Sequence, residues 1–232
     1  MRIAEIFRSI QGEGRLTGVE SVFVRASGCN LRCRWCDTRY ASWTPEGEDL
    51  SVGEILAQIE QAASSRPVRH AVLTGGEPML FAELIPLAAA LHEAGWHITV
   101  ETAGTLYLPV ACDLMSISPK LSNSAPTLEP DRHWANRHNQ QRHAPESIRR
   151  LLAEYDCQLK FVVDRPEDCD EVASYVAEFP EISPSQVMLM PQGVDAAALV
   201  SKAAWLEPYC EALGWVYCPR RQVEWFGAQR GK

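Results

Sequence analysis

Apolar and polar positions along the chain follow two alternating patterns. Short apolar runs rich in β-branched and aromatic residues are typical of buried strands, and they occur at 21–27, 68–74, 96–102, 114–118, 158–164 and 187–190. The segments between them have apolar residues at helical spacing, and they cover 51–63, 83–95, 146–155, 170–179 and 196–214. This alternation predicts an α/β fold with a mostly parallel sheet. Because no dinucleotide-binding glycine fingerprint accompanies it, we expect an incomplete (β/α) barrel rather than a doubly wound sheet.

Local signals mark the ends of three of these helices. Ser51 followed by Glu54 is the signature of a capping box, in which the side chain of each residue accepts a hydrogen bond from the backbone of the other. Gly95 and Gly214 stand where two helices should stop.

The segment 121–145 is the one long polar insertion, and we expect it to form a loop or flap. It includes three histidines that stand five residues apart, His133, His138 and His143. A step of five residues on a helix rotates the side chain by about 140° and would scatter the rings. We therefore expect a solvated flap rather than a metal site.

Polar motifs follow five of the predicted strands. They are the cysteine-rich stretch 28–36, "GGEP" at 75–78, "ETAGT" at 101–105, "SPK" at 118–120 and "MPQG" at 190–193. In a parallel barrel the carboxyl ends of the strands share one face, which is where active sites lie. Any single motif could be turn punctuation, but five together predict one site built from distant parts of the chain.

Composition limits the classes of function. A chain of 232 residues with 46% hydrophobic content can bury a full core as a single domain spanning 1–232. A net charge of −8 argues against a broad phosphate-binding surface, so we expect no direct nucleic-acid partner. The sequence shows neither a secretory signal nor an apolar run that would span a membrane. We expect a cytoplasmic protein, in which a tight cysteine cluster indicates a metal site or catalysis rather than disulfides.

Three cysteines, Cys29, Cys33 and Cys36, form the pattern CxxxCxxC. A structural zinc site usually takes four protein ligands, commonly as two CxxC pairs, and no second pair is present. A 4Fe-4S cluster held by three thiolates leaves one iron without a protein ligand, where a small molecule can bind and react. Four further cysteines lie in strand or helix patterns, and we interpret them as ordinary buried thiols: Cys112, Cys157, Cys169 and Cys210.

The cysteine pattern, with Trp35 before the last cysteine and "GGEP" further on, resembles the radical S-adenosylmethionine (SAM) enzymes. The resemblance implies a 4Fe-4S cluster whose open iron binds SAM, and a one-electron reduction that cleaves SAM to a 5′-deoxyadenosyl radical. Gly75 and Gly76 lack side chains, so the backbone there could approach the methionine end of SAM and bond its ammonium group.

Longer segments, "SIQGEGRLTGVESVFVRASGCNLRCRWCDT", "VLTGGEP", "ETAGT" and "SISPKLSNS", resemble the 7-carboxy-7-deazaguanine synthase family. That family converts 6-carboxy-5,6,7,8-tetrahydropterin to 7-carboxy-7-deazaguanine with loss of ammonia, in the queuosine pathway of tRNA modification. The resemblance implies a lyase with a modified radical SAM core, Mg²⁺ as a further cofactor, a homodimer, and a flavodoxin or ferredoxin-type reductant. It implies no side chain acting as a covalent nucleophile, so the protein's part is positioning and electrostatics.

Matching positions carry over the substrate contacts of the family. The expected substrate-binding residues are Ile10, Gln11, Gly12, Glu13, Arg25, Thr74 and Glu101. The Arg25 guanidinium would suit the pterin carboxylate through paired hydrogen bonds. Its alternative role is a structural ion pair, for which Glu13 is a candidate partner. Gln222 stands where the family often has a histidine, so contacts from the C-terminal segment stay open.

Other matching positions correspond to the cofactor contacts. The expected SAM-binding residues are Trp35, Cys36, Asp37, Gly76, Ser118, Pro119, Lys120 and Gln192. Glu101 and Gln192 could instead be hydrogen-bonded polar groups at strand ends. Thr38 corresponds to the Mg²⁺ ligand of the family. Because one hydroxyl is a weak site for this ion, most ligands must be substrate oxygens and water, and we expect Mg²⁺ to bind only with substrate.

Two alternative functions remain open. An activase that forms a glycyl radical on a partner protein would share the cluster and "GGEP", but should lack the "QGEG" start and the pairing of Thr38 with Arg25. A non-catalytic iron-sulfur electron carrier would need neither "GGEP" nor "SPK" nor a deep pocket. Binding of SAM would separate the carrier from both enzymes.

Overall fold

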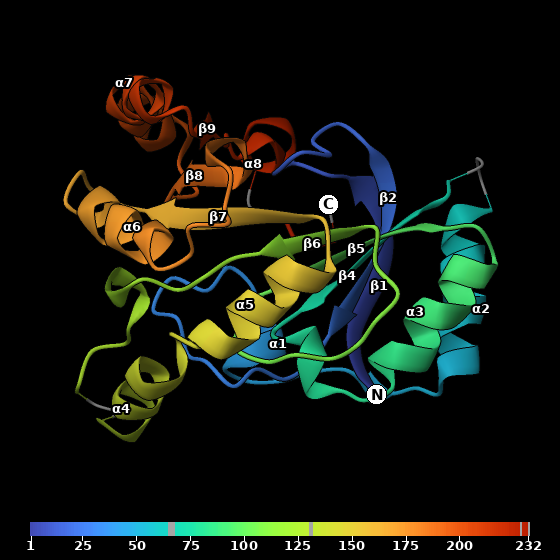
Figure 1. The fold of residues 1–232 in the computed structure, drawn as a ribbon. Coiled ribbons are helices and arrows are strands. Elements are labelled where there is room, and N and C mark those ends of the chain that lie inside the picture. Colours follow the sequence, from blue (N-terminus) through green and yellow to red (C-terminus); the bar gives the residue numbers. More distant parts are fainter. Residues whose placement is uncertain (65–67, 130–131, 228, 232) are drawn as a thin grey trace.

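The structure is a computed structural model that describes residues 1–64, 68–129, 132–227 and 229–231. The strands of this part of the chain form a single sheet (Figure 1). Its nine described strands run in the order β3-β1-β2-β4-β5-β6-β7-β8-β9. Their bounds are β1 Arg2–Ile10, β2 Glu20–Ala26, β3 Glu48–Asp49, β4 His70–Gly75, β5 His97–Thr102, β6 Leu114–Ile117, β7 Cys157–Val163, β8 Val187–Pro191 and β9 Val216–Tyr217.

Every pairing from β2 to β9 is parallel, whereas β1 is antiparallel to both β2 and β3. The order of the described strands starts at β3 and ends at β9, so these strands form an open sheet rather than a closed barrel. The predicted incomplete barrel with a mostly parallel sheet is therefore confirmed. All six predicted strands are present; β1, β3 and β9 were not predicted.

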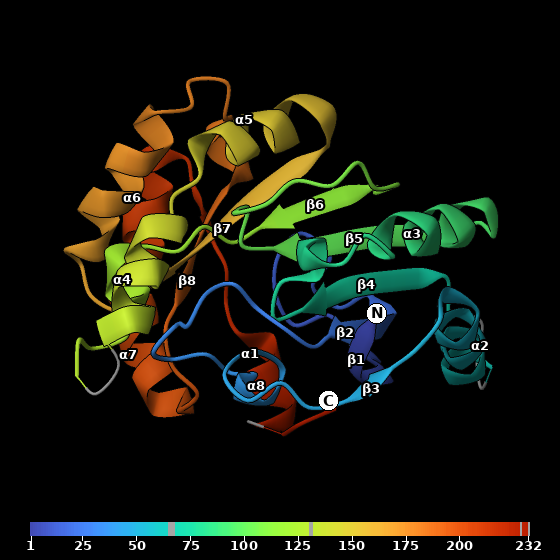
Figure 2. The same cartoon turned by 90° about the horizontal axis from the view of Figure 1, so that it is seen from below.

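Helices cover the outer side of this sheet, as the two views in Figures 1 and 2 show. The α-helices are α1 Arg39–Ser42, α2 Val52–Ala63, α3 Leu84–Glu93, α4 Arg132–Gln141, α5 Pro145–Glu154, α6 Asp168–Ala177, α7 Ala196–Leu213 and α8 Arg221–Phe226. Apolar side chains from α2, α3, α5, α6 and α7 join the strands in one buried core. The short helices α1 and α8 lie at the opposite, open side, near the carboxyl ends of the strands (Figure 2).

The predicted helix ends agree with the structure. Ser51 and Glu54 form a complete capping box at the start of α2. Gly214 ends α7 in the left-handed conformation at a φ of 66°, and Gly95 follows α3 at a φ of 75°. No helix in the described ranges is both long and apolar enough to cross a membrane.

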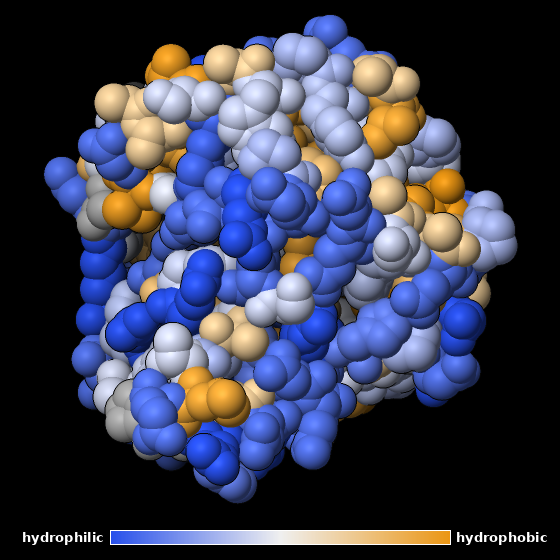
Figure 3. All heavy atoms as spheres, turned by 90° about the vertical axis from the view of Figure 1, so that its left-hand side faces the viewer, coloured by the Kyte–Doolittle hydropathy of each residue, from blue (hydrophilic) through white to orange (hydrophobic). Residues whose placement is uncertain are grey.

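The loop or flap predicted at 121–145 includes a helix with a buried side; Pro130 and Asp131 lie outside the described residues. Residues 132–141 form α4, and His138 on this helix is fully buried. Figure 3 shows that the face carrying α4, α6 and α7 is mostly hydrophilic, so α4 has one solvated side and one packed side. Polar composition alone predicted solvent exposure, but the buried His138 ring has hydrogen-bond partners within the protein.

The three evenly spaced histidines point to different surroundings. The ring of His133 meets the edge of Trp134, and His143 lies 3.1 Å from Glu178 on the nearby surface. His138 faces inward and bonds Ser124 and the backbone of the cysteine loop. The rings therefore do not converge, which confirms the prediction made from the five-residue spacing.

We expect the capping box of α2 to contribute measurably to stability. The Ser51 hydroxyl accepts from Glu54 N, and the Glu54 carboxylate accepts from Ser51 N at 2.8 Å. Ser51→Ala should lower the free energy of unfolding by about 1 kcal/mol, within a range of roughly 0.5–2 kcal/mol. Urea denaturation checks this. The control is Ser201→Ala in the interior of α7, where the hydroxyl only bonds back to Ala197 O and alanine favours the helix. Equal urea midpoints for the two variants would contradict the prediction.

Candidate active site

A cavity of about 680 Å³ opens at the carboxyl ends of the parallel strands. Each of the five polar motifs found in the sequence contributes at least one lining residue, so the predicted convergence takes place. The sequence-predicted residues that line the cavity are Ile10, Gln11, Gly12, Glu13, Arg25, Cys29, Cys33, Trp35, Cys36, Asp37, Thr38, Thr74, Gly76, Glu101, Ser118 and Lys120. A volume of this size lies within the range of about 300–1,000 Å³ that is usual for small-molecule sites.

Two predicted SAM contacts are not among the residues that line the cavity. Pro119 is buried beside lining residues Ser118 and Lys120. Gln192 begins the loop after β8, where its N–H donates to Val163 O and its carbonyl accepts from Lys202 Nζ at 2.6 Å. These bonds hold the Gln192 backbone at the strand end, and the role of its side chain stays a prediction.

The three cysteine side chains line the cavity from a loop without regular secondary structure. Gly28 N donates to Ala41 O at 2.8 Å, and Trp43 Nε1 donates to the carbonyl of Cys33 at 3.0 Å. Cys36 Sγ lies 3.1 Å from the Ser42 hydroxyl. The loop is thus folded around α1, which holds the thiols on one side of the cavity.

The chemistry of these thiols fits an iron-sulfur cluster. Burial, and then the charge of Glu77, raises the pKa of Cys29 to about 12, and burial raises the pKa of Cys33 to about 11. Such thiols become thiolates when a metal supplies positive charge. In the described part of the chain, no three His, Cys, Asp or Glu side chains lie close enough to enclose a single ion. Three thiols on one side of a cavity instead suit the separate irons of a cluster, which leaves one iron open.

The second glycine of "GGEP" packs against the cysteine loop. A Cβ at Gly76 would stand 2.6 Å from Ala41 O and 2.8 Å from Cys29 Cβ, closer than real Cβ atoms approach. Gly75 has a φ of 152°, a backbone conformation that residues with a side chain rarely adopt. The structure therefore gives Gly76 a role that the sequence analysis missed: any side chain there would push the cysteine loop away.

Glu77, the third residue of "GGEP", is buried and connects neighbouring strand ends. Its carboxylate accepts from Met79 N at 3.1 Å, from the Thr102 hydroxyl at 2.8 Å and from Ala103 N at 2.8 Å. Burial raises the pKa of Glu77 above its ordinary value, although these hydrogen bonds favour the charged form. Glu77 was not predicted as a site residue; the signal that could have identified it is a carboxylate that stands between two buried apolar strands in the sequence.

Arg25 lines the cavity and is paired with Glu5, which was also missed. Arg25 Nε donates to Glu5 Oε1 at 2.7 Å, and the two residues lie opposite each other on β2 and β1. Tyr40 and Arg230 also donate to this carboxylate. Burial alone would raise the pKa of Glu5, but its hydrogen bonds to Arg25 and Tyr40 lower it. The suggestion that Glu13 would be the ion-pair partner of Arg25 is wrong, because the antiparallel strand β1, which supplies Glu5, was not predicted.

An aromatic wall adjoins Arg25. Phe7 and Phe23 are cross-strand neighbours whose rings stack at 5.2 Å with an interplanar angle of 9°, and both line the cavity. The Arg25 guanidinium lies 5.7 Å from the centre of the Phe7 ring. A cation beside flat apolar surfaces is suited to a planar anionic heterocycle.

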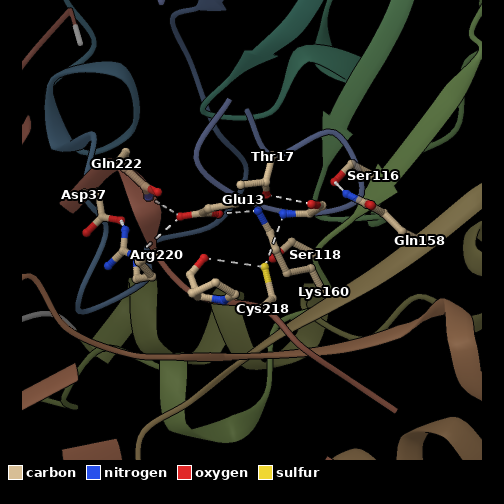
Figure 4. Close-up of polar contacts among 12 residues, drawn as sticks. Glu13, Thr17, Asp37, Ser116, Ser118, Gln158, Lys160, Cys218, Arg220 and Gln222 are labelled. Carbon is tan, nitrogen blue, oxygen red and sulfur yellow. Dashed lines mark hydrogen bonds and ion pairs between the residues drawn. The ribbon is translucent and has the colours of Figure 1, made fainter. Parts of the chain in front are cut away.

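Glu13 is part of a buried charge network (Figure 4). One carboxylate oxygen bonds Lys160 Nζ, and the other bonds Gln222 Nε2 and Arg220 Nε, the last at 3.3 Å. Burial alone would raise the pKa of Glu13, but the charges of Lys160 and Arg220 outweigh it and lower the pKa to about 2. Arg220 also bonds Asp37, so the network reaches the cysteine loop.

Gln222 brings the C-terminal segment into the site. Because the Glu13 carboxylate only accepts, the Gln222 amide must turn its NH₂ group toward it. The Oε1 atom of Gln222 is buried, and no described group bonds it. Gln222 lines the cavity, and so do Val223 from α8 and Arg230. The C-terminal segment therefore lines the cavity, while its contacts with the substrate stay open.

Comparison with known proteins places these features in a family. The profile of the radical SAM superfamily matches residues 23–158. The chain is 44% identical to 7-carboxy-7-deazaguanine synthase of Rhodopirellula baltica over 230 residues, which is 99% of this chain and 88% of that protein. It is 42% identical to the synthase of Halobacterium salinarum, over 95% of this chain and 88% of that protein.

Solved structures agree in fold. The crystal structure of QueE from Escherichia coli superimposes with a TM-score of 0.69 at 24% identity and covers 95% of this chain and 93% of that one. Streptococcus suis SuiB bound to S-adenosylmethionine matches with a TM-score of 0.58 at 13% identity, over 84% of this chain and 48% of that one. By the profile match and the identity to full-length relatives, the chain belongs to the radical SAM superfamily and, within it, to the 7-carboxy-7-deazaguanine synthase family.

Proposed function

We propose that this chain is a 7-carboxy-7-deazaguanine synthase, a carbon-nitrogen lyase of queuosine and 7-deazapurine biosynthesis. Its substrate would be 6-carboxy-5,6,7,8-tetrahydropterin, which loses ammonia as its ring contracts. The observation that carries the proposal is that one cavity combines the three cysteine thiols with Arg25 and a stacked aromatic wall. A cavity of about 680 Å³ also favours an enzyme over a non-catalytic electron carrier, which needs no such space.

The cluster would be held by Cys29, Cys33 and Cys36. With SAM bound, it supplies a one-electron reduction that generates the 5′-deoxyadenosyl radical. The lining residues that would position SAM are Trp35, Cys36, Asp37, Gly76, Ser118 and Lys120. Lys120 Nζ is held by the carbonyl and hydroxyl of Ser118, at 2.6 and 2.7 Å, which places a cation where a carboxylate can bind. Contacts from Pro119 and Gln192 stay predictions, because neither lines the cavity.

The substrate would bind with its carboxylate on Arg25 and its rings along Phe7 and Phe23. Glu5 holds the guanidinium in place through Nε, and a planar guanidinium can still offer its other N–H donors to a carboxylate. Thr74 pairs with Arg25 in the register of β4 and β2, so its hydroxyl is at the same depth. Gln11 and Glu101 would supply further contacts from the lining. Both carboxylate oxygens of Glu13 already bond protein groups. We therefore propose that Glu13 holds neighbouring side chains in place rather than contacting the substrate directly.

The Mg²⁺ site, the dimer, the reductant and the location stay predictions. Thr38 lines the cavity at the start of α1 and would bind Mg²⁺ only together with substrate oxygens and water. A homodimer, a flavodoxin or ferredoxin-type reductant and a cytoplasmic location are further predictions from the sequence. The single domain at 1–232 is supported by the fact that all described strands belong to one sheet.

The proposed reaction is tested by the mass of its product. After anaerobic reconstitution with iron and sulfide, we expect the reduced protein to convert 6-carboxytetrahydropterin to 7-carboxy-7-deazaguanine when SAM is added. Cys33→Ala should lose iron and turnover, whereas Cys112→Ala, outside the cavity lining, should keep both. If 5′-deoxyadenosine formed without that product, the cofactor chemistry would stand but the substrate assignment would fail.

Removal of the Arg25 guanidinium should weaken substrate binding. A hydrogen bond to a charged group contributes about 1.5–3 kcal/mol, so we expect Arg25→Gln to raise KM by roughly 10- to 100-fold. Steady-state kinetics with varied substrate check this. Arg69→Gln is the control, because Arg69 pairs with Glu60 on the surface away from the cavity. An unchanged KM in Arg25→Gln would remove Arg25 from the substrate site.

Loss of the Thr38 hydroxyl should affect only the response to Mg²⁺. Thr38→Val keeps the shape of the side chain but removes the oxygen ligand, so the stimulation of turnover by Mg²⁺ should fall at least severalfold. The iron content should not change. Thr44→Val, in an exposed position after α1, is the matched control. The assignment would be contradicted by a Thr38→Val enzyme with the same Mg²⁺ titration as the parent.

A further inference from the structure

The two peptide N–H groups on either side of Cys33 are both bound by the polar insertion. Arg32 N donates to His138 Nδ1 at 3.2 Å, and Arg34 N donates to Ser124 O at 2.9 Å. The cysteine loop has no regular secondary structure there, so these bonds replace those that a helix or strand would provide. The position of Cys33 therefore depends on a segment about a hundred residues further along the chain.

The His138 ring is fully buried, and its two nitrogens have different roles. Because Nδ1 accepts from Arg32 N, the ring proton must be on Nε2, which donates to Ser124 Oγ at 3.0 Å. The Ser124 hydroxyl in turn donates to Leu121 O at 2.6 Å. Burial, with the nearby charges of Arg142 and Lys120, lowers the pKa of His138 to about 4, so the ring is neutral near pH 7 and Nδ1 is free to accept.

The side chain of Arg32 adds a second connection to α4. Its guanidinium lies 3.8 Å from the centre of the Trp134 ring, and it donates to Cys29 O and Leu31 O at 2.8 Å each. Trp134 and His138 are four residues apart and share one face of the helix. That face of α4 therefore contacts both the backbone and the side chain of Arg32.

The segment itself is fixed to the body of the fold. Arg142, just after α4, donates to Lys120 O at 3.1 Å and to Glu171 on α6 at 3.0 Å. Glu171 also accepts from Ser122 N at 2.8 Å. Both ends of the insertion are thus attached to α6, so α4 can act as a fixed support rather than a mobile cover.

We propose that His138 is a positioning residue for the cluster-binding loop: its Nδ1 fixes the Arg32 peptide, so that Cys33 presents its thiol to the cavity. The inference rests on the proposed function only in that Cys29, Cys33 and Cys36 hold the cluster. His138 does not touch the reacting atoms. Its contribution is to give a buried N–H its acceptor, without which the loop would open toward water.

Two amide variants separate the two ring nitrogens. The side-chain amide of His138→Asn lies near the position of Nδ1 and can accept from Arg32 N, whereas the longer side chain of His138→Gln places its amide near Nε2. Hydrogen exchange of the protein without iron, followed by mass spectrometry of peptides covering residues 31–34, measures the loop directly. We expect exchange to accelerate about tenfold or more in His138→Gln and to stay within about threefold of the parent in His138→Asn.

Ile59→Ala controls for a general loss of stability. Ile59 is fully buried on α2, away from α4 (Figure 1), so this variant should lower the melting temperature without changing exchange at residues 31–34. After reconstitution, the rate of iron release to a chelator should follow the same order, with His138→Gln at least tenfold faster than the parent and His138→Asn close to it.

The outcomes are distinct. Slow exchange and slow iron release in His138→Gln would overturn the proposal, and so would equal acceleration in both amide variants, because the acceptor at Nδ1 would then not matter. Acceleration in Ile59→Ala as large as in His138→Gln would also overturn it. If His138 behaves as expected but no deazaguanine product forms, the proposed substrate fails while the role of His138 stands.

Discussion

A loop without regular secondary structure must take the hydrogen bonds of its backbone from its surroundings, and the cysteine loop at 28–36 imposes this constraint on the whole site. Gly28 donates to Ala41 O and accepts from Glu77 N, and Trp43 holds the carbonyl of Cys33. The insertion around α4 holds the remaining side. Because the contacts come from different parts of the chain, three thiols can share one cavity only after the fold around them is complete.

The charges inside the cavity are arranged for orientation rather than for stability. Replacing a buried ion pair with apolar residues often does not destabilise a protein, so the pairs around Glu13 and Glu5 call for another explanation. Each carboxylate holds two basic side chains in fixed positions, Lys160 and Arg220 in one case and Arg25 and Arg230 in the other. Cations held in a low-dielectric cavity attract anionic ligands even though the chain carries a net charge of −8.

The sequence predicted the parallel strands and the convergence of their polar ends, because periodicity and chain order are enough for both. It did not predict β1, of which only the last residues, Ser9 and Ile10, were interpreted, as the start of a family motif. The error about Arg25 followed from this, since Glu5 is identified as its partner only by the register of β1 and β2. The burial of His138 could not be predicted either, because a polar helix resembles a flap until its hydrogen-bond partners, far away in the sequence, are known.

The site joins segments from both ends of the described chain. Residues 220–222 meet Glu13 and Asp37, and Arg230 bonds Glu5 and Glu46 while it lies 3.8 Å from the Tyr40 ring. These contacts are more than 180 residues apart in sequence, so their loop-closure entropy is lost before any of them can stabilise the fold. The parallel strands can pair without these contacts. Until the C-terminal segment docks, Asp37 beside the cysteine loop lacks its partner Arg220. Docking of the C-terminal segment therefore completes the charge network beside the three cysteines.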